Sequence, residues 1–430
     1  MDHDQPAGSR AGQRRRRDRG LHHRRHDPAA GPAWAGAAPR RAPWGDDPVR
    51  GRPHRRGRRG RPRRPRHRRL RRLERLRRLR RLAWVDTRSE GSELTLSDDG
   101  GPSDTPPVLT HDDGVIAIDT LTAGMTDVTA GYLIDAPRPA LIECGPALTI
   151  GSVLQGLAAL GLGPTDLAYL VLTHIHLDHA GGAGDVAAAF PNATVVVSEH
   201  GARHLAEPDR LNASSARVYG PLFDTVYGAC TPVPAERLRS IADRDELDLG
   251  AGRVLELLHT PGHAKHHLGV VDPDIGAVFS GDSVGVQLPG MTELRPATPP
   301  PEFHLDAALR SLDRYRERSP GRIYLAHYGP VDPADAVLDQ AEEQLRRWVE
   351  VAEQARNEAH TLGLTGTHEL DHVAETLQHR FHVQWPQSAE AADVAEDDAR
   401  LRMLNDTRAN AAGLLRYLHR RDTGELTELG

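Results

Sequence analysis

The stretch His174-Ile175-His176-Leu177-Asp178-His179 follows closely after the apolar run Leu167–Leu172 and places three imidazoles and one carboxylate within six residues. Alternation along an extended backbone points the first two imidazoles to the same side. The last two ligand candidates stand where the chain turns toward a helix, so they approach from another direction. Imidazole nitrogen and carboxylate oxygen suit Zn²⁺ and neighbouring divalent metals. The stretch alone is compatible with an exposed polar loop or one structural zinc, but it favours two adjacent ions.

Three more metal-ligand residues occur farther along the chain, each where an apolar run ends. They are His263 after Val254–Leu258, Asp282 after Ala277–Phe279 and His327 after Arg322–Ala326. Five imidazoles and two carboxylates in such positions are hard to explain as an exposed polar loop. Together they predict a two-metal hydrolytic site in which a metal-activated hydroxide attacks a substrate carbonyl, so that a Ser or Cys nucleophile is not required.

From about residue 108, short apolar runs alternate with helical stretches. The expected strands are Val115–Leu121, Tyr132–Ile134, Ala140–Ile142, Leu167–Leu172, Thr194–Val197, Val254–Leu258, Leu268–Val271, Ala277–Phe279 and Arg322–Ala326. Helices are expected at Val153–Leu160 and Val186–Phe190. We therefore predict an α/β catalytic domain over residues 108–333, with insertions between core elements at 208–234 and 287–303.

After Pro333 the apolar residues follow the spacing of an amphipathic helix, which predicts a helical C-terminal extension over residues 334–430. Further helices are expected near 367–381 and 388–420. Their apolar stripes need a surface to cover, which could be the catalytic domain, each other or a second copy of the chain. A lid or a homodimer interface is therefore plausible.

Residues 1–85 differ in composition from the rest of the chain. Residues 1–81 contain 29 Arg and 7 Asp plus Glu, a net charge of +22, so the total of −5 leaves −27 for the remaining 349 residues. Such a segment buries too little apolar surface to offset chain entropy, and we predict a disordered Arg-rich arm. Three interpretations stay open: a nucleic-acid-binding arm, an unselected solvated extension, or a mis-assigned start, which the repeated Arg-Arg-Leu triplets favour.

The two cysteines, Cys144 and Cys230, are too few for a disulfide framework, which favours a reducing compartment. The sequence contains neither the apolar segment of a secretory signal nor a run of about 18 apolar residues. We therefore expect a cytoplasmic protein that acts on a small-molecule substrate and has no membrane partner. Nucleic acid is an expected partner only if the Arg-rich arm is translated and functional.

The ordered series of ligands resembles that of the metallo-β-lactamase superfamily over roughly residues 108–333. The most similar stretches are Glu143-Cys144-Gly145-Pro146, Thr173–Gly182, Thr260–His267 and Gly281-Asp282-Ser283, which look like a prokaryotic group of hydrolases of unassigned substrate. The resemblance implies an αββα sandwich with two metals at one edge. It points to the branch that contains glyoxalase II and the lactonases.

The resemblance also implies a role for each ligand. The first metal would be held by His174, His176 and His263, the second by Asp178, His179 and His327, and Asp282 would bridge them. Zn²⁺ is the expected metal, with Mn or Fe as alternatives, and Asp178 and Asp282 are the predicted catalytic residues. Glu143 would support the ligand loop from behind, or it is a simple turn carboxylate. His266 and His267 are assigned to the rim of the site or to the following strand.

Three functions compete. The leading hypothesis is hydrolysis of a small ester, thioester or lactone, because the ligand set resembles that of hydroxyacylglutathione hydrolases and lactonases. The second is phosphodiester cleavage, which the acidic character of residues 82–430 disfavours, since a polyanion would be repelled. The third is a nucleic-acid-binding protein with a structural metal, but structural zinc sites are typically closed by four ligands, whereas seven leave room for water and substrate.

Deletion of residues 1–81 separates these functions. If the chain is a hydrolase, hydrolysis by the truncated protein will stay within about twofold of that of the full chain, because none of the ligand candidates is removed. Binding to nucleic acid will disappear, because the polycation that releases counterions is gone. The measurement compares hydrolysis of a substrate panel and DNA binding at two salt concentrations; loss of hydrolysis on truncation would contradict the hypothesis.

Overall fold

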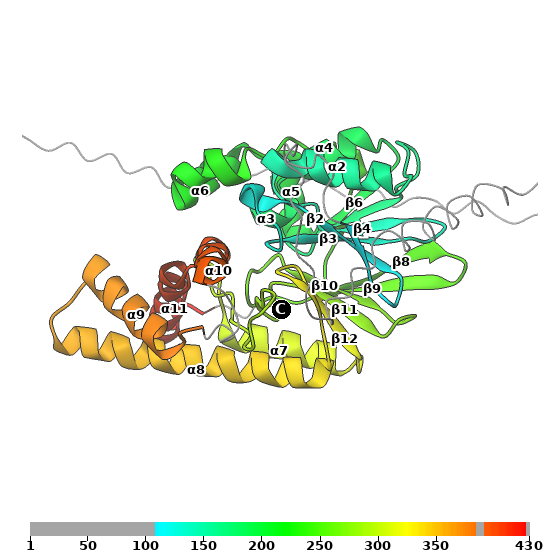
Figure 1. The fold of residues 1–430 in the computed structure, drawn as a ribbon. Coiled ribbons are helices and arrows are strands. Elements are labelled where there is room, and N and C mark those ends of the chain that lie inside the picture. Colours follow the sequence, from blue (N-terminus) through cyan, green and yellow to red (C-terminus); the bar gives the residue numbers. More distant parts are fainter. Residues whose placement is uncertain (1–107, 384–390, 427–430) are drawn as a thin grey trace, which may run out of the picture. The chain divides into compact units, whose positions relative to one another are not determined.

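The computed structural model describes residues 108–383 and 391–426 of the 430-residue chain. The predicted Arg-rich arm of residues 1–85 lies outside the described residues. Within them the chain forms two β-sheets with helices on their outer faces, followed by C-terminal helices (Figure 1). The expected αββα sandwich with a C-terminal helical extension is confirmed.

The first sheet has seven strands in sequence order, antiparallel from β1 to β4 and parallel from β4 to β7. Its strands are β1 (Val108–Thr110), β2 (Val115–Asp119), β3 (Ala130–Ile134), β4 (Ala140–Ile142), β5 (Tyr169–Val171), β6 (Thr194–Ser198) and β7 (Leu238–Ile241). The strands β2 to β5 are buried along their whole length. This burial on both faces explains why they read as nearly continuous apolar runs.

The second sheet has six strands in the order β13-β12-β11-β10-β9-β8, and only β11 and β12 are parallel. They are β8 (Arg244–Gly250), β9 (Arg253–His259), β10 (Leu268–Asp272), β11 (Ala277–Gly281), β12 (Arg322–Leu325) and β13 (Gly329–Val331). Alternation decides which core each side chain joins. On β9, Leu257 points between the sheets, whereas Leu258 packs under the outer helices.

Helices cover the outer face of each sheet (Figure 1). On the first sheet lie α2 (Ile150–Ala159), α3 (Leu177–Ala180), α4 (Ala183–Ala189) and α5 (Glu199–Ala206), followed by α6 (Asp209–Tyr219) and a π-helix, η3 (Phe223–Tyr227). Short 3₁₀ turns are η1 (Thr122–Gly124), η2 (Ala147–Thr149) and η4 (Ala235–Arg237). On the second sheet lie α7 (Leu305–Arg316) and α8 (Ala334–Thr361).

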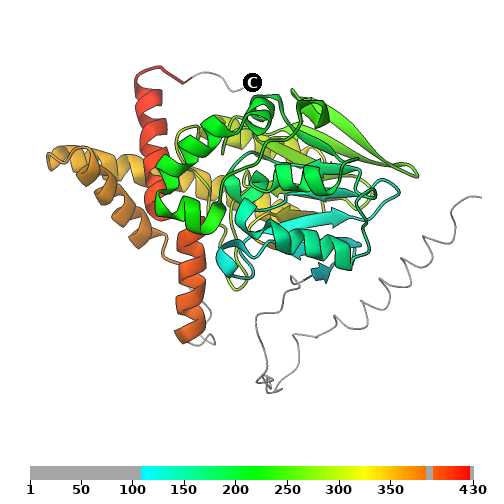
Figure 2. The same ribbon diagram turned by 90° about the horizontal axis from the view of Figure 1, so that it is seen from above.

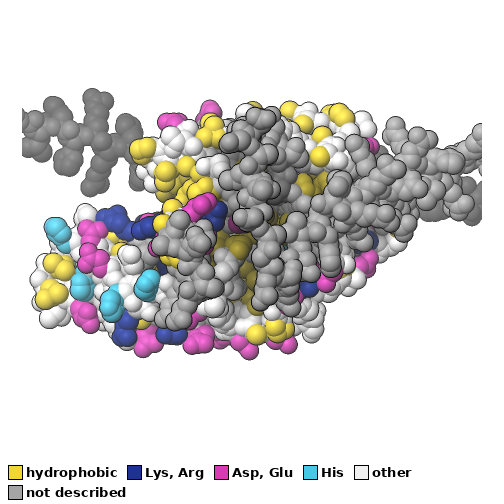
Figure 3. Space-filling model, viewed as in Figure 1, with side chains coloured by type: hydrophobic (Ala, Val, Ile, Leu, Met, Phe, Trp, Pro, Cys, Tyr) yellow, Lys and Arg dark blue, Asp and Glu magenta, His cyan; other side chains and the backbone are white. Residues whose placement is uncertain are grey.

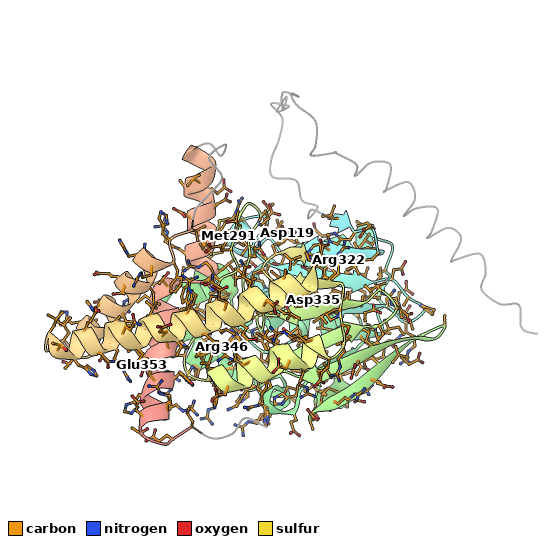
Figure 4. All side chains as sticks on the ribbon, turned by 90° about the horizontal axis from the view of Figure 1, so that it is seen from below. Asp119, Met291, Arg322, Asp335, Arg346 and Glu353 are labelled. Carbon is orange, nitrogen blue, oxygen red and sulfur yellow. The ribbon has the colours of Figure 1, made fainter. Side chains whose placement is uncertain are left out.

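The C-terminal helices continue from α8 as α9 (Thr367–Arg380), α10 (Ala391–Leu404) and α11 (Thr407–Asp422) (Figure 2). The predicted amphipathic face of α8 is confirmed, since Leu338, Leu345 and Trp348 are buried against the sandwich and the following helices. Figure 4 labels Asp335 near the start of α8 and Glu353 farther along it, where Glu353 pairs with Arg421 of α11. The apolar stripes thus cover the catalytic domain and each other.

Several details of the sequence prediction were wrong or incomplete. The stretch 388–420 was expected as one helix, but Asn405 and Asp406 separate α10 from α11, because the Asp406 carboxylate caps α11 by accepting from the Ala409 N–H at 2.7 Å. Strand β8 was not predicted, since its few apolar residues stand among acids. The short strands β1, β7 and β13 and the helices α5, α6 and α7 were not predicted either.

None of the helices in residues 108–383 and 391–426 combines the length and apolar character that crossing a bilayer requires.

The packing of α8 generates a stability prediction. Trp348 is fully buried, stacks on Phe381 with ring centroids 4.9 Å apart, and lies beneath the Arg295 guanidinium. Trp348→Ala will lower the free energy of unfolding by about 3–5 kcal/mol, as expected for loss of a large buried aromatic side chain. Urea unfolding followed by circular dichroism measures this. The control Leu362→Ala, at a residue 66% exposed, will change it by less than about 0.5 kcal/mol, and a similar loss in both variants would contradict the described packing.

Candidate metal centre

All seven predicted ligands meet where strands of both sheets end. His174 and His176 lie in the loop after β5, and Asp178 and His179 open the short helix α3. The three downstream ligands follow later strands: His263 in the turn after β9, Asp282 directly after β11 and His327 just after β12. Six of the seven are buried, and His176 is half-buried.

The first group of ligands consists of His174, His176 and His263. The Nδ1 atom of His176 lies 2.9 Å from Nε2 of His174 and 3.0 Å from Nε2 of His263. Burial lowers the pKa of all three imidazoles, that of His176 to about 3, so they are neutral near pH 7. The Nδ1 atom of His263 lies 3.0 Å from the Ala297 carbonyl oxygen and can donate a hydrogen bond to it. When Nδ1 carries the proton, the lone pair of Nε2 faces the other rings.

The second group consists of Asp178, His179 and His327. An Asp178 carboxylate oxygen lies 3.5 Å from Nε2 of both imidazoles, whose Nε2 atoms are 3.2 Å apart. Burial opposes protonation of His179 and His327, but the carboxylates of Asp178 and Asp282 outweigh it and raise the pKa of both rings. These carboxylates therefore require positive charge at this point, which a divalent cation would supply in place of the two protons.

Asp282 lies between the two groups and presents one carboxylate oxygen to each. Its Oδ2 is 3.5 Å from Nε2 of His263 and 4.0 Å from Nε2 of His174. Its Oδ1 is 3.5 Å from Nε2 of His179 and 3.4 Å from Nε2 of His327. Oδ1 is buried without a hydrogen-bond partner among the described residues, a costly state for a carboxylate unless a cation faces it. The residues present therefore fit divalent metal ions.

Glu143 lies behind the second group of candidate ligands, next to His179. Its backbone adopts a left-handed conformation (φ 64°), and its buried carboxylate accepts the Thr173 N–H at 3.2 Å through Oε1. Its other oxygen lies 3.6 Å from Nδ1 of His179. The next two backbone N–H groups, of Cys144 and Gly145, donate to the His179 carbonyl at 3.0 and 3.1 Å. The carboxylate thus faces a ligand imidazole rather than solvent, and in this position it can orient the ring.

His267 has a structural role that the sequence analysis missed. It is fully buried directly before β10, which agrees with the expected position at the following strand rather than at the rim, and its Nε2 accepts the backbone N–H of Asp282 at 3.3 Å. Its Nδ1 lies 2.9 Å from Oγ1 of Thr260, so the turn Thr260–His267 both carries the ligand His263 and supports Asp282. The only signal for this role was that His267 follows His263 by four residues within one turn.

An apolar wall flanks Asp178. It contains Leu177, Tyr219, Phe223, Val226 and Tyr227, together with Met403 of α10. The rings of Tyr219 and Tyr227 lie 4.4 Å apart, and burial, followed by the nearby Asp178 carboxylate, raises the pKa of both phenols, so both keep their protons at neutral pH. Figure 3 shows hydrophobic side chains gathered over α6, the helix that ends at Tyr219.

An αββα sandwich with imidazole and carboxylate groups clustered at its strand ends defines a class of metal-dependent hydrolases. The family model for the metallo-beta-lactamase superfamily matches residues 108–327, and the chain belongs to that superfamily. The sequence-based recognition of the superfamily is thereby confirmed.

Known proteins similar to this chain include the archaeal metallo-beta-lactamase fold-containing protein ST1585 from Sulfurisphaera tokodaii. It is 31% identical over 218 residues, which cover 49% of this chain and 80% of that protein. Its crystal structure matches with a TM-score of 0.51 at 24% identity over 70% of this chain and 98% of that one, a likeness of fold. A hydroxyacylglutathione hydrolase from Aeromonas hydrophila is 31% identical over 132 residues, 31% of this chain and 38% of that protein.

Removal of the Glu143 carboxylate tests whether it orients the imidazole of His179. Glu143→Ala will weaken metal binding about 10- to 100-fold, the usual effect of removing an outer partner of a ligand imidazole. Competition with a chromophoric chelator measures the affinity, and Glu246→Ala, at an exposed acid on β8, is the control. Equal affinities for the Glu143→Ala variant and the unaltered protein would assign Glu143 to the turn alone.

Proposed function

We propose that this protein is a binuclear metal-dependent hydrolase of a small ester, thioester or lactone. The observation that carries the proposal is the position of Asp282, whose two carboxylate oxygens face two separate groups of ligands. A single structural ion would not require a buried carboxylate placed in this way. Seven ligand residues also exceed the four that close a structural zinc site.

In this proposal His174, His176 and His263 would hold one cation, Asp178, His179 and His327 would hold the other, and Asp282 would contribute a carboxylate oxygen to each. Zn²⁺ suits this mixture of nitrogen and oxygen ligands, with Mn or Fe as alternatives. A bound pair would lower the pKa of a shared water to near neutral and would polarise a substrate carbonyl.

The protein's own residues orient the reactants. The Ala297 carbonyl can accept a hydrogen bond from the Nδ1–H of His263, and the Val128 carbonyl can accept one from the Nδ1–H of His327 at 2.8 Å. Each bond turns Nε2 of its ring toward the centre. Asp178 is placed to accept a hydrogen bond from an attacking water. The phenols of Tyr219 and Tyr227, protonated and beside Asp178, can donate hydrogen bonds to a substrate oxygen.

The proposed substrate class is supported by the net charge of the chain, by the apolar wall and by the proteins to which the chain is similar. Residues 82–430 carry a net charge of −27, which disfavours a polyanionic phosphodiester. The apolar wall beside Asp178 suits an uncharged organic group on the substrate. Hydroxyacylglutathione hydrolases from Aeromonas hydrophila and a Synechococcus strain are among the similar proteins, which supports the glyoxalase II and lactonase branch.

The test combines metal analysis of purified protein with a panel of thioesters, lactones and phosphodiesters. We expect two divalent ions per chain and turnover of a thioester or lactone. Asp282→Ala will lower kcat/KM by more than about 100-fold, because even outer partners of metal ligands contribute 10- to 100-fold. Asp248→Ala, at an exposed carboxylate on β8, is the matched control.

Three results would overturn the proposal. They are hydrolysis of the panel by metal-free protein, full activity of the Asp282→Ala variant, and turnover confined to phosphodiesters. The last result would favour the second hypothesis, phosphodiester cleavage.

A further inference from the structure

The loop Arg295–Thr298 connects the metal centre to the C-terminal helices. Its Ala297 carbonyl oxygen lies 3.0 Å from Nδ1 of His263, the contact that turns Nε2 of this ring toward His176. Ala297 itself has no long side chain to anchor it. The position of its carbonyl therefore depends on what holds the residues on either side.

Two asparagines hold those neighbouring residues. Asn405, at the end of α10, donates from Nδ2 to the Pro296 carbonyl at 3.0 Å. Asn410, in the first turns of α11, accepts the Thr298 N–H at 2.6 Å through Oδ1. Asn410 also donates from Nδ2 to Oδ1 of Asn405 at 2.9 Å, so the two amides form one unit. Both side chains are at most 4% exposed. Buried amides of this kind fix one arrangement of their neighbours only when all of their hydrogen bonds are made.

Arg295 ties the same loop to other helices. Its guanidinium donates to the Phe381 carbonyl at 2.7 Å, to Oγ1 of Thr407 at 3.1 Å and to Oδ1 of Asn405 at 3.3 Å. It also lies over the ring of Trp348 on α8, 4.8 Å from the centroid. The loop is thus fixed to α8, to the end of α9 and to the junction of α10 and α11.

The backbone of α11 lies directly against this loop. A Cβ atom added at Gly413 would overlap the Thr298 carbonyl and would come within 2.7 Å of the Pro299 carbonyl carbon. Glycine is therefore required here for close approach rather than for an unusual backbone conformation. The backbone of α11 at Gly413 is therefore in direct contact with Thr298, the residue that follows Ala297.

We propose that Asn405 and Asn410 are positioning residues of the metal centre, which hold the Ala297 carbonyl against His263. The proposal rests on the proposed function in that His263 is a metal ligand. The C-terminal helices then complete the first ligand group, whereas the second group is oriented by Glu143 and the Val128 carbonyl, which lie elsewhere. Loss of the paired asparagines will therefore weaken the binding of one of the two cations.

The experiment titrates the full-length, metal-depleted protein with Co²⁺ and follows the ligand-field spectrum. Asn410→Ala will weaken one of two binding steps about 10-fold, the lower end of the effect of outer partners, and leave the other within about twofold. Asn410→Asp, which keeps the oxygen that accepts from Thr298, will recover part of the loss. Leu418→Ala, at a buried core residue of the same helix, will lower the melting temperature without selecting one binding step.

A second measurement decides the proposal even if the chain binds fewer than two cations, a result that would count against the proposed function alone. Nitrogen-15 NMR of histidine-labelled, metal-free protein reports the tautomer of His263, assigned by comparison with His263→Ala. We expect the Nδ1–H tautomer in the unaltered protein and in Leu418→Ala, and a mixture of tautomers in Asn410→Ala. Identical tautomers and identical Co²⁺ affinities in Asn410→Ala and the unaltered protein would overturn the positioning role.

Discussion

Burial of the Asp282 carboxylate among five imidazoles is the constraint on which the rest of the structure depends. A carboxylate without a hydrogen-bond partner on one oxygen is costly in the interior, and the three neutral imidazoles of the first group, with their converging lone pairs, do not relieve that cost. Divalent cations do, because they satisfy nitrogen and oxygen lone pairs at once. The strand ends and turns of both sheets bring together buried imidazoles and carboxylates whose clustering is unfavourable without a cation. Such clustering is expected at a functional site rather than at a site that only stabilises the fold.

The contacts behind the ligands come from well-separated parts of the chain. Nδ1 of His179 faces Glu143 after β4, that of His327 faces Val128 before β3, and that of His263 faces Ala297 in the insertion before α7. Each partner lies in a different segment, so these three rings are held by residues remote from their own loops, whereas Nδ1 of His174 lies 3.0 Å from Oγ1 of the adjacent Thr173. In the proposed function the insertion 287–303 and the C-terminal helices therefore bear on the chemistry, although they contain none of the seven candidate ligands.

Membership of the superfamily gives the fold and the metal-dependent hydrolase class, but the substrate is selected by loops at the strand ends. In the proposed function those loops are the α6–η3 insertion with Tyr219 and Tyr227, and the segment that packs against α10. The mainly apolar lining and the two protonated phenols lie in these loops, outside the strands of the two sheets.

The sequence determined the αββα class only through the resemblance of its ligand series to the metallo-β-lactamase superfamily. The residues by themselves determined most core strands and the seven side chains that meet at the centre, because each candidate ligand follows a local apolar run whose end can be recognised in the sequence. It also predicted the amphipathic face of α8. The break at Asn405 and Asp406, the strand β8 and the buried position of His267 were decided by tertiary structure, since their partners are remote in sequence. The same holds for the geometry of the site. Which oxygen of Asp282 faces which imidazoles, and which carbonyl orients His263, depend on distances between residues up to about 150 positions apart, and periodicity carries no information at that range.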